Sequence, residues 1–140
     1  MLYIERAVPA DYPVIADIDL EVMESDRLDP HEMGSGGWWW VVKDGGHIVG
    51  YAGIEYAGYG EVGFFSRVGL LPVARGQGLH RDFLRVCGAE ARRLGWTQMI
   101  TYVHRLNAPS LNNFIKCGYK TYIPDEDWGC DGAVYLYRDL

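Results

Sequence analysis

One stretch decides the fold expected for this chain: Leu70-Leu71-Pro72-Val73-Ala74-Arg75-Gly76-Gln77-Gly78-Leu79-His80. An apolar, strand-like run ends at Pro72, two glycines flank Gln77, and an amphipathic helix pattern begins at once. Glycine lets backbone N–H groups come close to a ligand because it has no Cβ. The N-terminus of the helix adds unpaired donors and about half a positive charge. The junction therefore predicts a site for a phosphate-bearing cofactor.

The rest of the chain alternates strand and helix patterns. Strands are expected at 2–8, 38–43, 47–56, 61–71, 97–104, 119–123 and 133–138. Helices are expected after Pro9, from 78 to about 94 and at 108–117, with a short helix or loop within 24–37. The Asp44-Gly45-Gly46 turn indicates a hairpin. This order predicts an α/β (α+β) domain with a mixed sheet.

Length and composition indicate an ordinary globular protein. The chain has 140 residues, of which 49% are hydrophobic and 23% charged, and this fits one domain over residues 1–140. No apolar run approaches the roughly 20 residues of a membrane span. The N-terminus lacks the basic and long apolar regions of a secretory signal. We therefore expect a soluble, cytoplasmic protein without a membrane partner.

Charge, cysteine and histidine content exclude several other classes. The net charge of −6 gives a nucleic-acid partner little electrostatic help, so none is expected. The three cysteines are odd in number and lack CxxC spacing, which argues against a disulfide framework or a zinc site. The four histidines show no metal-ligand spacing. No metal is expected.

Positive charge is nevertheless concentrated around the glycine loop. Six of the 13 basic residues fall between positions 67 and 93, where only two acids occur. We expect Arg75 and Arg81 to line the phosphate site. A solvated helix face explains Arg92 and Arg93 equally well.

Two motifs resemble those of the GNAT family of N-acetyltransferases. The first is Arg75-x-x-Gly78-x-His80, which follows a strand that ends in an aliphatic-x-Pro run. It is not a triphosphate-binding loop, because no Gly-Lys-Ser/Thr follows it. The second motif runs from Asn107 to Tyr119. Its matching positions are Asn107, Ser110, Lys116, Gly118 and Tyr119.

The resemblance covers nearly the whole chain and implies a fold and a cofactor. The implied fold is a mixed, mostly antiparallel sheet of about seven strands with three to four helices, splayed between the strands that end near Leu71 and His104. The cofactor is acetyl-CoA, a co-substrate whose pantetheine arm would bond to the first of these strands. The residues implied to bind it are Val68, Gly69, Leu70, Arg75, Gly76, Gln77, Gly78, Leu79, His80, Arg81, Asn107 and Phe114.

The resemblance also implies the reaction, which is direct transfer of the acetyl group to a primary amine in a ternary complex. His80 and Phe114 depart from the family pattern. His80 replaces a small residue, so its side chain either points away, crowds the phosphates or acts as a base. Phe114 stands where many members carry a tyrosine that protonates the departing thiolate. Water, Tyr119 or Tyr122 would have to replace that proton donor, although strand packing with an exposed hydroxyl is the preferred explanation of both tyrosines.

The base that takes the proton of the amine is open among three residues. Glu61 opens the strand before the glycine loop, where some relatives carry a glutamate nearby. Tyr102 lies five residues before Asn107, at another position where relatives use a glutamate. His104 shares a strand face with Tyr102, and imidazoles change charge near neutral pH. An exposed strand residue without a catalytic role is the alternative for Glu61.

Acidic segments predict the class of acceptor. They contain Glu21, Glu24, Asp26, Asp29 and Glu32, and later Asp125, Glu126, Asp127 and Asp131 around Trp128. A cationic small molecule or peptide amine would be attracted to them, and solvated loops are the alternative. Two rival functions remain, an acyl-CoA-binding or regulatory module that lost the chemistry and a structural domain with a vacant loop. The chain is expected to be a monomer or a homodimer.

Overall fold

The computed structural model describes residues 2–23 and 27–140. The chain forms two compact units, Met1–Glu55 with Ser66–Phe83 and Tyr56–Phe65 with Leu84–Leu140. Strand β4 (Val62–Leu70) and helix α3 (Leu79–Arg93) contribute to both units. Within the described residues, the strand order is β1-β2-β3-β4-β5-β7-β6, a seven-stranded, mostly antiparallel sheet accompanied by four α-helices. The expectation of a single domain over residues 1–140 stays a prediction.

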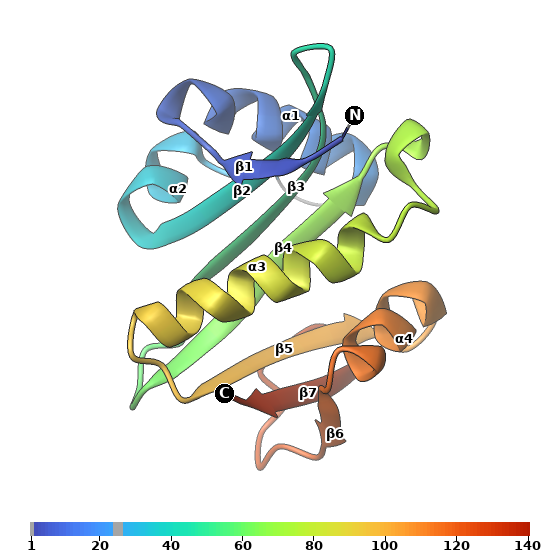
Figure 1. Ribbon diagram of the computed structural model, residues 1–140. Helices are drawn as coiled ribbons and strands as arrows, with labels where there is room; N and C mark the ends of the chain where they lie inside the picture. The colour runs from blue at the N-terminus through green and yellow to red at the C-terminus, as the bar shows by residue number, and fades with distance from the viewer. Residues whose placement is uncertain (1, 24–26) are drawn as a thin grey trace. The chain divides into compact units, whose positions relative to one another are not determined.

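The first unit is built on three antiparallel strands that lie side by side (Figure 1). They are β1 (Ile4–Arg6), β2 (Gly37–Asp44) and β3 (His47–Tyr56). The hairpin expected between β2 and β3 is confirmed, because Gly45 and Gly46 adopt φ angles of +57° and +85°. Strand β4 continues the sheet beside β3, where Ser66 Oγ donates to the carbonyl of Gly53 at 3.0 Å.

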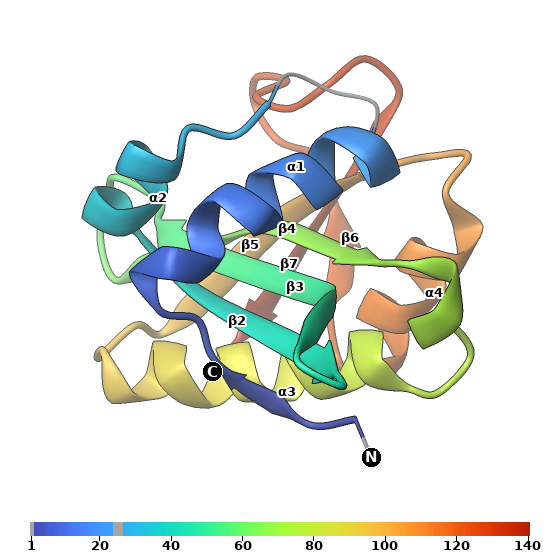
Figure 2. The same ribbon diagram turned by 90° about the horizontal axis from the view of Figure 1, so that it is seen from above.

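Helices α1 (Tyr12–Met23) and α2 (Pro30–Gly36) cover one face of β2 and β3 (Figure 2). Both helices begin at a proline or shortly before one, and Asp29 caps α2 by accepting the N–H of His31 at 2.9 Å. Of the two alternatives for 24–37, a short helix or a loop, the structure shows a helix at Pro30–Gly36. The first strand is shorter than the expected 2–8, because the N–H of Val8 bonds to the Asp11 carboxylate at 2.9 Å and leaves the sheet.

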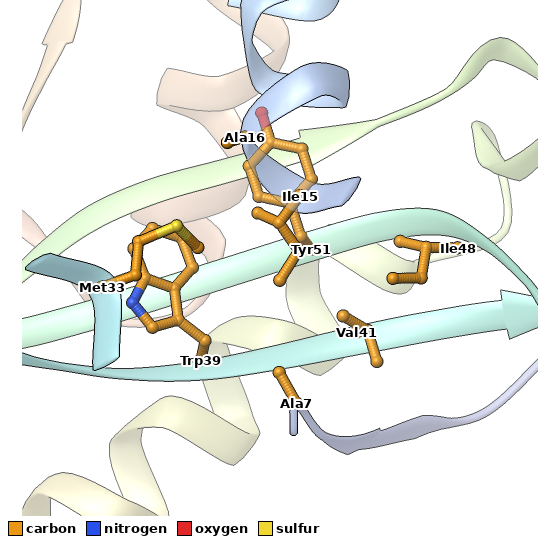
Figure 3. Packing of buried hydrophobic residues seen from close by; sticks show 8 residues of the cluster. All are labelled: Ala7, Ile15, Ala16, Met33, Trp39, Val41, Ile48 and Tyr51. Carbon is orange, nitrogen blue, oxygen red and sulfur yellow. The ribbon is translucent and has the colours of Figure 1, made fainter. Parts of the chain in front are cut away.

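The core of the first unit lies between these helices and the sheet (Figure 3). Alternation along the strands places Trp39 and Val41 of β2 on the same face. Tyr51 of β3 joins them, and Ile15 and Ala16 of α1 pack against this face. Ile15, Val41 and Tyr51 are completely buried. This packing holds β3 against α1, and β3 in turn borders the strand that leads into the glycine loop.

The second unit carries the C-terminal strands and helix α4 (Ala108–Lys116). Its strands are β5 (Gln98–His104), β6 (Lys120–Tyr122) and β7 (Ala133–Asp139). Strand β5 pairs in parallel with β4 over Val62–Phe64 and antiparallel with β7 along its whole length. Strand β6 pairs with the other edge of β7 (Figure 1).

Helix α3 follows the glycine loop as expected. Phe83, Cys87 and Ala91 recur at four-residue spacing and are completely buried. The helix ends at Arg93, and Gly95 closes it in the left-handed conformation with φ +83°. Within the described ranges, no helix is both long and apolar enough to cross a membrane.

Candidate functional site

The glycine loop has the open geometry of an anion site. Gly76 and Gly78 adopt φ angles of +76° and +77°, a region that L side chains rarely enter. A Cβ at Gly76 would meet nothing within 4 Å, so the space beside it is open. A Cβ at Gly78 would lie 3.7 Å from Nη2 of Arg81, so that guanidinium lies next to the loop. Backbone without side chains and the Arg81 guanidinium therefore lie close together at this loop, as an anion site requires.

Two side chains of the loop bond to the backbone of residues that precede it. Arg75 Nε donates to the carbonyl of Leu70 at 3.1 Å, and Gln77 Nε2 donates to the carbonyl of Val73 at 3.1 Å. The N–H of Leu71 donates to Val49 of β3 at 2.8 Å. Arg75 thus joins the loop to the end of β4. The sequence did not predict this hydrogen bond of Arg75, which stabilises the conformation of the loop.

The first turn of α3 follows directly after Gly78, which has no side chain. Its N–H groups point toward the N-terminal end of the helix, and the first helical bond of the turn joins Asp82 N to the carbonyl of Gly78 at 3.1 Å. Leu79 is buried and anchors the turn. Burial lowers the pKa of His80 to about 4, so the imidazole is neutral at pH 7. Its Nδ1 atom is buried although the residue as a whole is half-buried, and the choice among the three alternatives for His80 stays a prediction.

The stretch 68–70 of β4 contains a close contact at Gly69. The group that approaches is the side chain of Tyr51 on β3. A Cβ at Gly69 would lie 2.5 Å from Cζ and 2.6 Å from Cε1 of that ring, with the hydroxyl oxygen nearer still. Only glycine fits this position of β4 while Tyr51 is present.

A buried polar pair near this strand was missed by the sequence reasoning. The Tyr51 hydroxyl donates to Oδ1 of Asp19 on α1 at 2.6 Å, and both residues are completely buried. Burial, reinforced by Asp19, raises the pKa of Tyr51, so the phenol keeps its proton. The available signal was the position of Asp19 four residues after Ile15, on the buried stripe of the helix.

Glu55, near the end of β3, was also missed. Glu55 is an exposed residue, yet partial burial of its carboxyl raises the pKa, and the nearby Arg67 guanidinium opposes that effect. Carboxyls with raised pKa are typical of general bases, which adds Glu55 to the candidates. The signal in the sequence was a single acid at the end of an apolar strand.

The three bases expected from the sequence all belong to the second unit. Glu61 is exposed, and its carbonyl accepts the N–H of Thr97 at 2.8 Å. Tyr102 is half-buried and stacks on Phe64 with 6.0 Å between ring centroids. His104 is exposed, and its Nδ1 accepts the N–H of Leu106 at 3.2 Å.

The second motif also lies in this unit. Asn107 caps α4, because its Oδ1 accepts the N–H of Ser110 at 3.3 Å. Phe114 is a core residue whose ring meets Phe65 and Tyr119 edge-on, with centroids 5.4 Å and 5.0 Å away. Tyr119 is itself buried, and burial raises the pKa of its hydroxyl, which makes it a weaker acid. Tyr122, the other tyrosine considered as the acid, also has a raised pKa, chiefly because of burial.

An aromatic cluster in the second unit borders the late acidic loop. Trp128 packs edge-on against Phe64 and Tyr102, and its Nε1 donates to the Tyr122 hydroxyl at 3.2 Å. Trp128 remains 39% exposed, so one side of the cluster faces solvent. The neighbouring carboxylates are all exposed, namely Asp125, Glu126, Asp127 and Asp131.

The acidic residues of the early segment have different environments. Glu21 and Glu32 are exposed, whereas Asp29 is used as the cap of α2. Glu24 and Asp26 lie outside the described residues. Across 2–23 and 27–140, no group of three or more His, Cys, Asp and Glu side chains is arranged to hold a metal ion.

The structure thus divides the predicted site residues between the two units. The stretch 68–70 and the loop 75–81 belong to the first unit, together with Asp19, Tyr51 and Glu55. Asn107, Phe114 and Tyr119 belong to the second, together with the three expected bases.

Comparisons with known proteins concern the family and the fold of the chain. The acetyltransferase (GNAT) family model matches residues 4–119. Among solved structures, yncA from Salmonella typhimurium, determined with its cofactor acetyl-CoA, is 21% identical with a TM-score of 0.81, over 100% of this chain and 94% of that one. A ribosomal-protein-alanine N-acetyltransferase from Brucella melitensis is 22% identical with a TM-score of 0.80, over 99% of each chain.

PaiA N-acetyltransferase from Thermoplasma acidophilum, solved in complex with coenzyme A, is 11% identical with a TM-score of 0.79, over 100% of this chain and 99% of that one. No curated protein sequence matches the chain significantly. At these identities the solved structures show a common fold, and the expectation of that fold is confirmed.

Proposed function

Because this chain belongs to the acetyltransferase (GNAT) family, we propose that it is an N-acetyltransferase that transfers the acetyl group of acetyl-CoA to a primary amine. The observation that carries the proposal is the loop at 76–81, where two left-handed glycines lead into the first turn of α3. In the proposal this loop binds the pyrophosphate, and Arg81 adds a cation. The backbone of 68–70 binds the pantetheine arm as an added strand would.

The reaction proposed is direct attack within a ternary complex. The nitrogen of the neutral amine attacks the thioester carbonyl carbon, a C–N bond forms, and the C–S bond breaks. The sulfur leaves with its electron pair as a thiolate, while the nitrogen loses one proton to a base. The products are an amide and coenzyme A. A thiol with a pKa of about 8.5 is a tolerable leaving group at neutral pH.

We propose that no tyrosine donates a proton to the departing sulfur. Phe114 has no hydroxyl, and the raised pKa of the buried Tyr119 makes that hydroxyl a poor acid. Solvent then protonates the thiolate after it leaves. The Tyr119→Phe variant should accordingly retain its turnover number within about threefold, far from the 10²-fold or greater loss expected for a general acid.

The base is one of four side chains, Glu61, Tyr102 and His104 from the sequence and Glu55 from the structure. His104 would first have to release the Leu106 N–H from Nδ1. The raised pKa of Glu55 makes its carboxylate a stronger proton acceptor than that of an unperturbed glutamate. Single variants Glu55→Gln and His104→Asn separate these two, because the pH–rate profile loses its acidic limb only when the base is replaced.

The acceptor proposed is a cationic amine, either a small molecule or a peptide. The support is the half-exposed Trp128 cluster beside four exposed carboxylates, since aromatic faces and anions both attract ammonium groups. A solvated acidic loop is the competing explanation. A monomeric or homodimeric assembly and a cytoplasmic location stay predictions.

Purified protein should be titrated with acetyl-CoA and then assayed for thiol release with a panel of amines. Polyamines, aminoglycosides and lysine peptides form the cationic arm, and neutral monoamines form the control arm. Turnover above background hydrolysis in the cationic arm supports the proposal. Binding without turnover for any amine would instead identify an acyl-CoA-binding module, which the missing hydroxyl at Phe114 favours as the second candidate. No binding at all would leave a structural domain.

A further inference from the structure

We propose that Asp19 and Tyr51 act as a positioning pair for the cofactor strand. Through Gly69, the pair fixes the backbone groups of Val68 and Leu70 that meet acetyl-CoA. The inference rests on the proposed function, because it assumes that the pantetheine arm lies along 68–70. It assigns a role in cofactor binding to two residues that belong to neither sequence motif.

The geometry forms a chain of three contacts across the first unit. Asp19 lies on α1, Tyr51 on β3 and Gly69 on β4. The Tyr51 hydroxyl donates to Asp19 Oδ1 at 2.6 Å, a short bond of the charge-assisted kind. Figure 3 shows the Tyr51 ring extending from β3 toward α1, with its hydroxyl oxygen at the helix. The same ring occupies the space beside the α-carbon of Gly69.

The pair is poorly suited to a purely structural role. Asp19 is completely buried, and its Oδ2 has no hydrogen-bond partner in the part of the chain that the structure describes. A buried carboxylate oxygen without a donor destabilises the fold, whereas a leucine and a phenylalanine would fill similar space without that cost. Such a group in a native protein calls for an explanation. Here the bond to Tyr51 supplies one, because it fixes where the ring lies.

The position of the ring determines where the cofactor strand can lie. Tyr51 is completely buried, and Ile15 and Val41 belong to the same core. The bond to Asp19 therefore removes the main remaining freedom of the ring, which is movement of its hydroxyl end. If that end moves, Gly69 can follow, and the amide and carbonyl groups on either side of it move too. Displacements of about 1 Å in binding groups are enough to weaken function severely.

The test is the double variant Asp19→Leu/Tyr51→Phe, compared with the wild type for acetyl-CoA binding and for denaturation midpoint. We expect a midpoint at or above that of the wild type, together with a dissociation constant raised about tenfold or more. Asp19→Asn keeps an acceptor oxygen for Tyr51 and should bind acetyl-CoA within about threefold of the wild type. Ile15→Val is the matched core control on α1, and it should lower the midpoint while leaving the dissociation constant within about twofold.

The possible outcomes lead to different conclusions. A double variant that binds acetyl-CoA like the wild type overturns this inference and leaves the proposed function standing. A double variant that loses stability in step with binding, or does not fold, makes the pair an ordinary core contact and also overturns it. Failure of the wild type to bind acetyl-CoA overturns the proposed function and this inference together.

Discussion

Replacing Gly69 with alanine should destabilise the protein strongly, although alanine has no backbone strain to bear there. Gly69 is not among the residues with positive φ, so the effect depends on space alone. The new Cβ would lie 2.5 Å from Cζ of Tyr51, whereas ordinary van der Waals contacts begin at 3.4 Å. The ring must therefore move by about 1 Å.

Such a movement breaks more than a packing contact. The Tyr51 hydroxyl already lies 2.6 Å from Asp19 Oδ1, and the ring is completely buried. Overpacking a core costs about 1–3 kcal/mol. Loss of a hydrogen bond to a charged group adds about 1.5–3 kcal/mol. We therefore expect a loss of about 2.5–6 kcal/mol, and a fall in Tm of roughly 9–20 °C for a chain of this size.

Urea unfolding and thermal melts of Gly69→Ala measure the loss directly. Gly36→Ala is the control, because Gly36 is helical, a Cβ there meets nothing within 4 Å, and the same substitution should be neutral or slightly stabilising. Adding Tyr51→Phe to Gly69→Ala should not restore stability, since the ring carbons still overlap the new methyl. A Gly69→Ala loss below about 1 kcal/mol, or full rescue by Tyr51→Phe, would refute the reasoning.

Three further changes have definite expected outcomes. Arg81→Gln should weaken acetyl-CoA binding about tenfold, because it removes the cation beside the loop. The control variant Arg92→Gln, at the far end of α3, should change the affinity less than twofold. Calorimetric titration of both variants measures the two affinities, and equal losses would contradict the placement of the phosphates. Gly88→Ala should raise the free energy of unfolding by about 0.5–1 kcal/mol, because a helical position prefers alanine. The new Cβ would meet Arg138 Nη1 at 4.0 Å, an ordinary contact distance. A lower urea midpoint would show a clash instead. His80 has a pKa of about 4 in the folded state against 6.5 in the unfolded chain, so the unfolded state takes up a proton that the folded state excludes as the pH falls from 7 to 4. Over that range the wild type should lose about 3 kcal/mol more of its free energy of unfolding than His80→Gln. Parallel curves of stability against pH for the two proteins would contradict the burial of the imidazole.

Local chemistry explains why the order of elements could be predicted. Glycines and prolines end the strands and helices where the structure ends them, as at Gly95 after α3 and at the hairpin glycines Gly45 and Gly46. The glycine loop could be recognised because its backbone conformation is encoded in residues 76–78 themselves. The first strand was predicted too long because the acceptor for the Val8 N–H is a side chain, Asp11, rather than the sheet.

The rest of the site depends on contacts between residues far apart in the sequence. Asp19 and Tyr51 are 32 positions apart, and only the packing of α1 on β3 brings them together. Tyr119 looked like a usable proton donor because hydroxyl chemistry is visible in a sequence, while the burial that raises its pKa is not. The choice among Glu61, Tyr102 and His104 depends on tertiary environment in the same way.

The contact between Tyr51 and Gly69 also limits how the chain can evolve. Position 69 cannot acquire any side chain while a tyrosine stands at position 51, so substitutions at the two positions must occur in a fixed order. A smaller residue has to appear on β3 before β4 can be changed beside it. Descendants of this sequence should therefore show the two positions changing together, with glycine at 69 opposite large residues at 51 and alanine at 69 only opposite small ones.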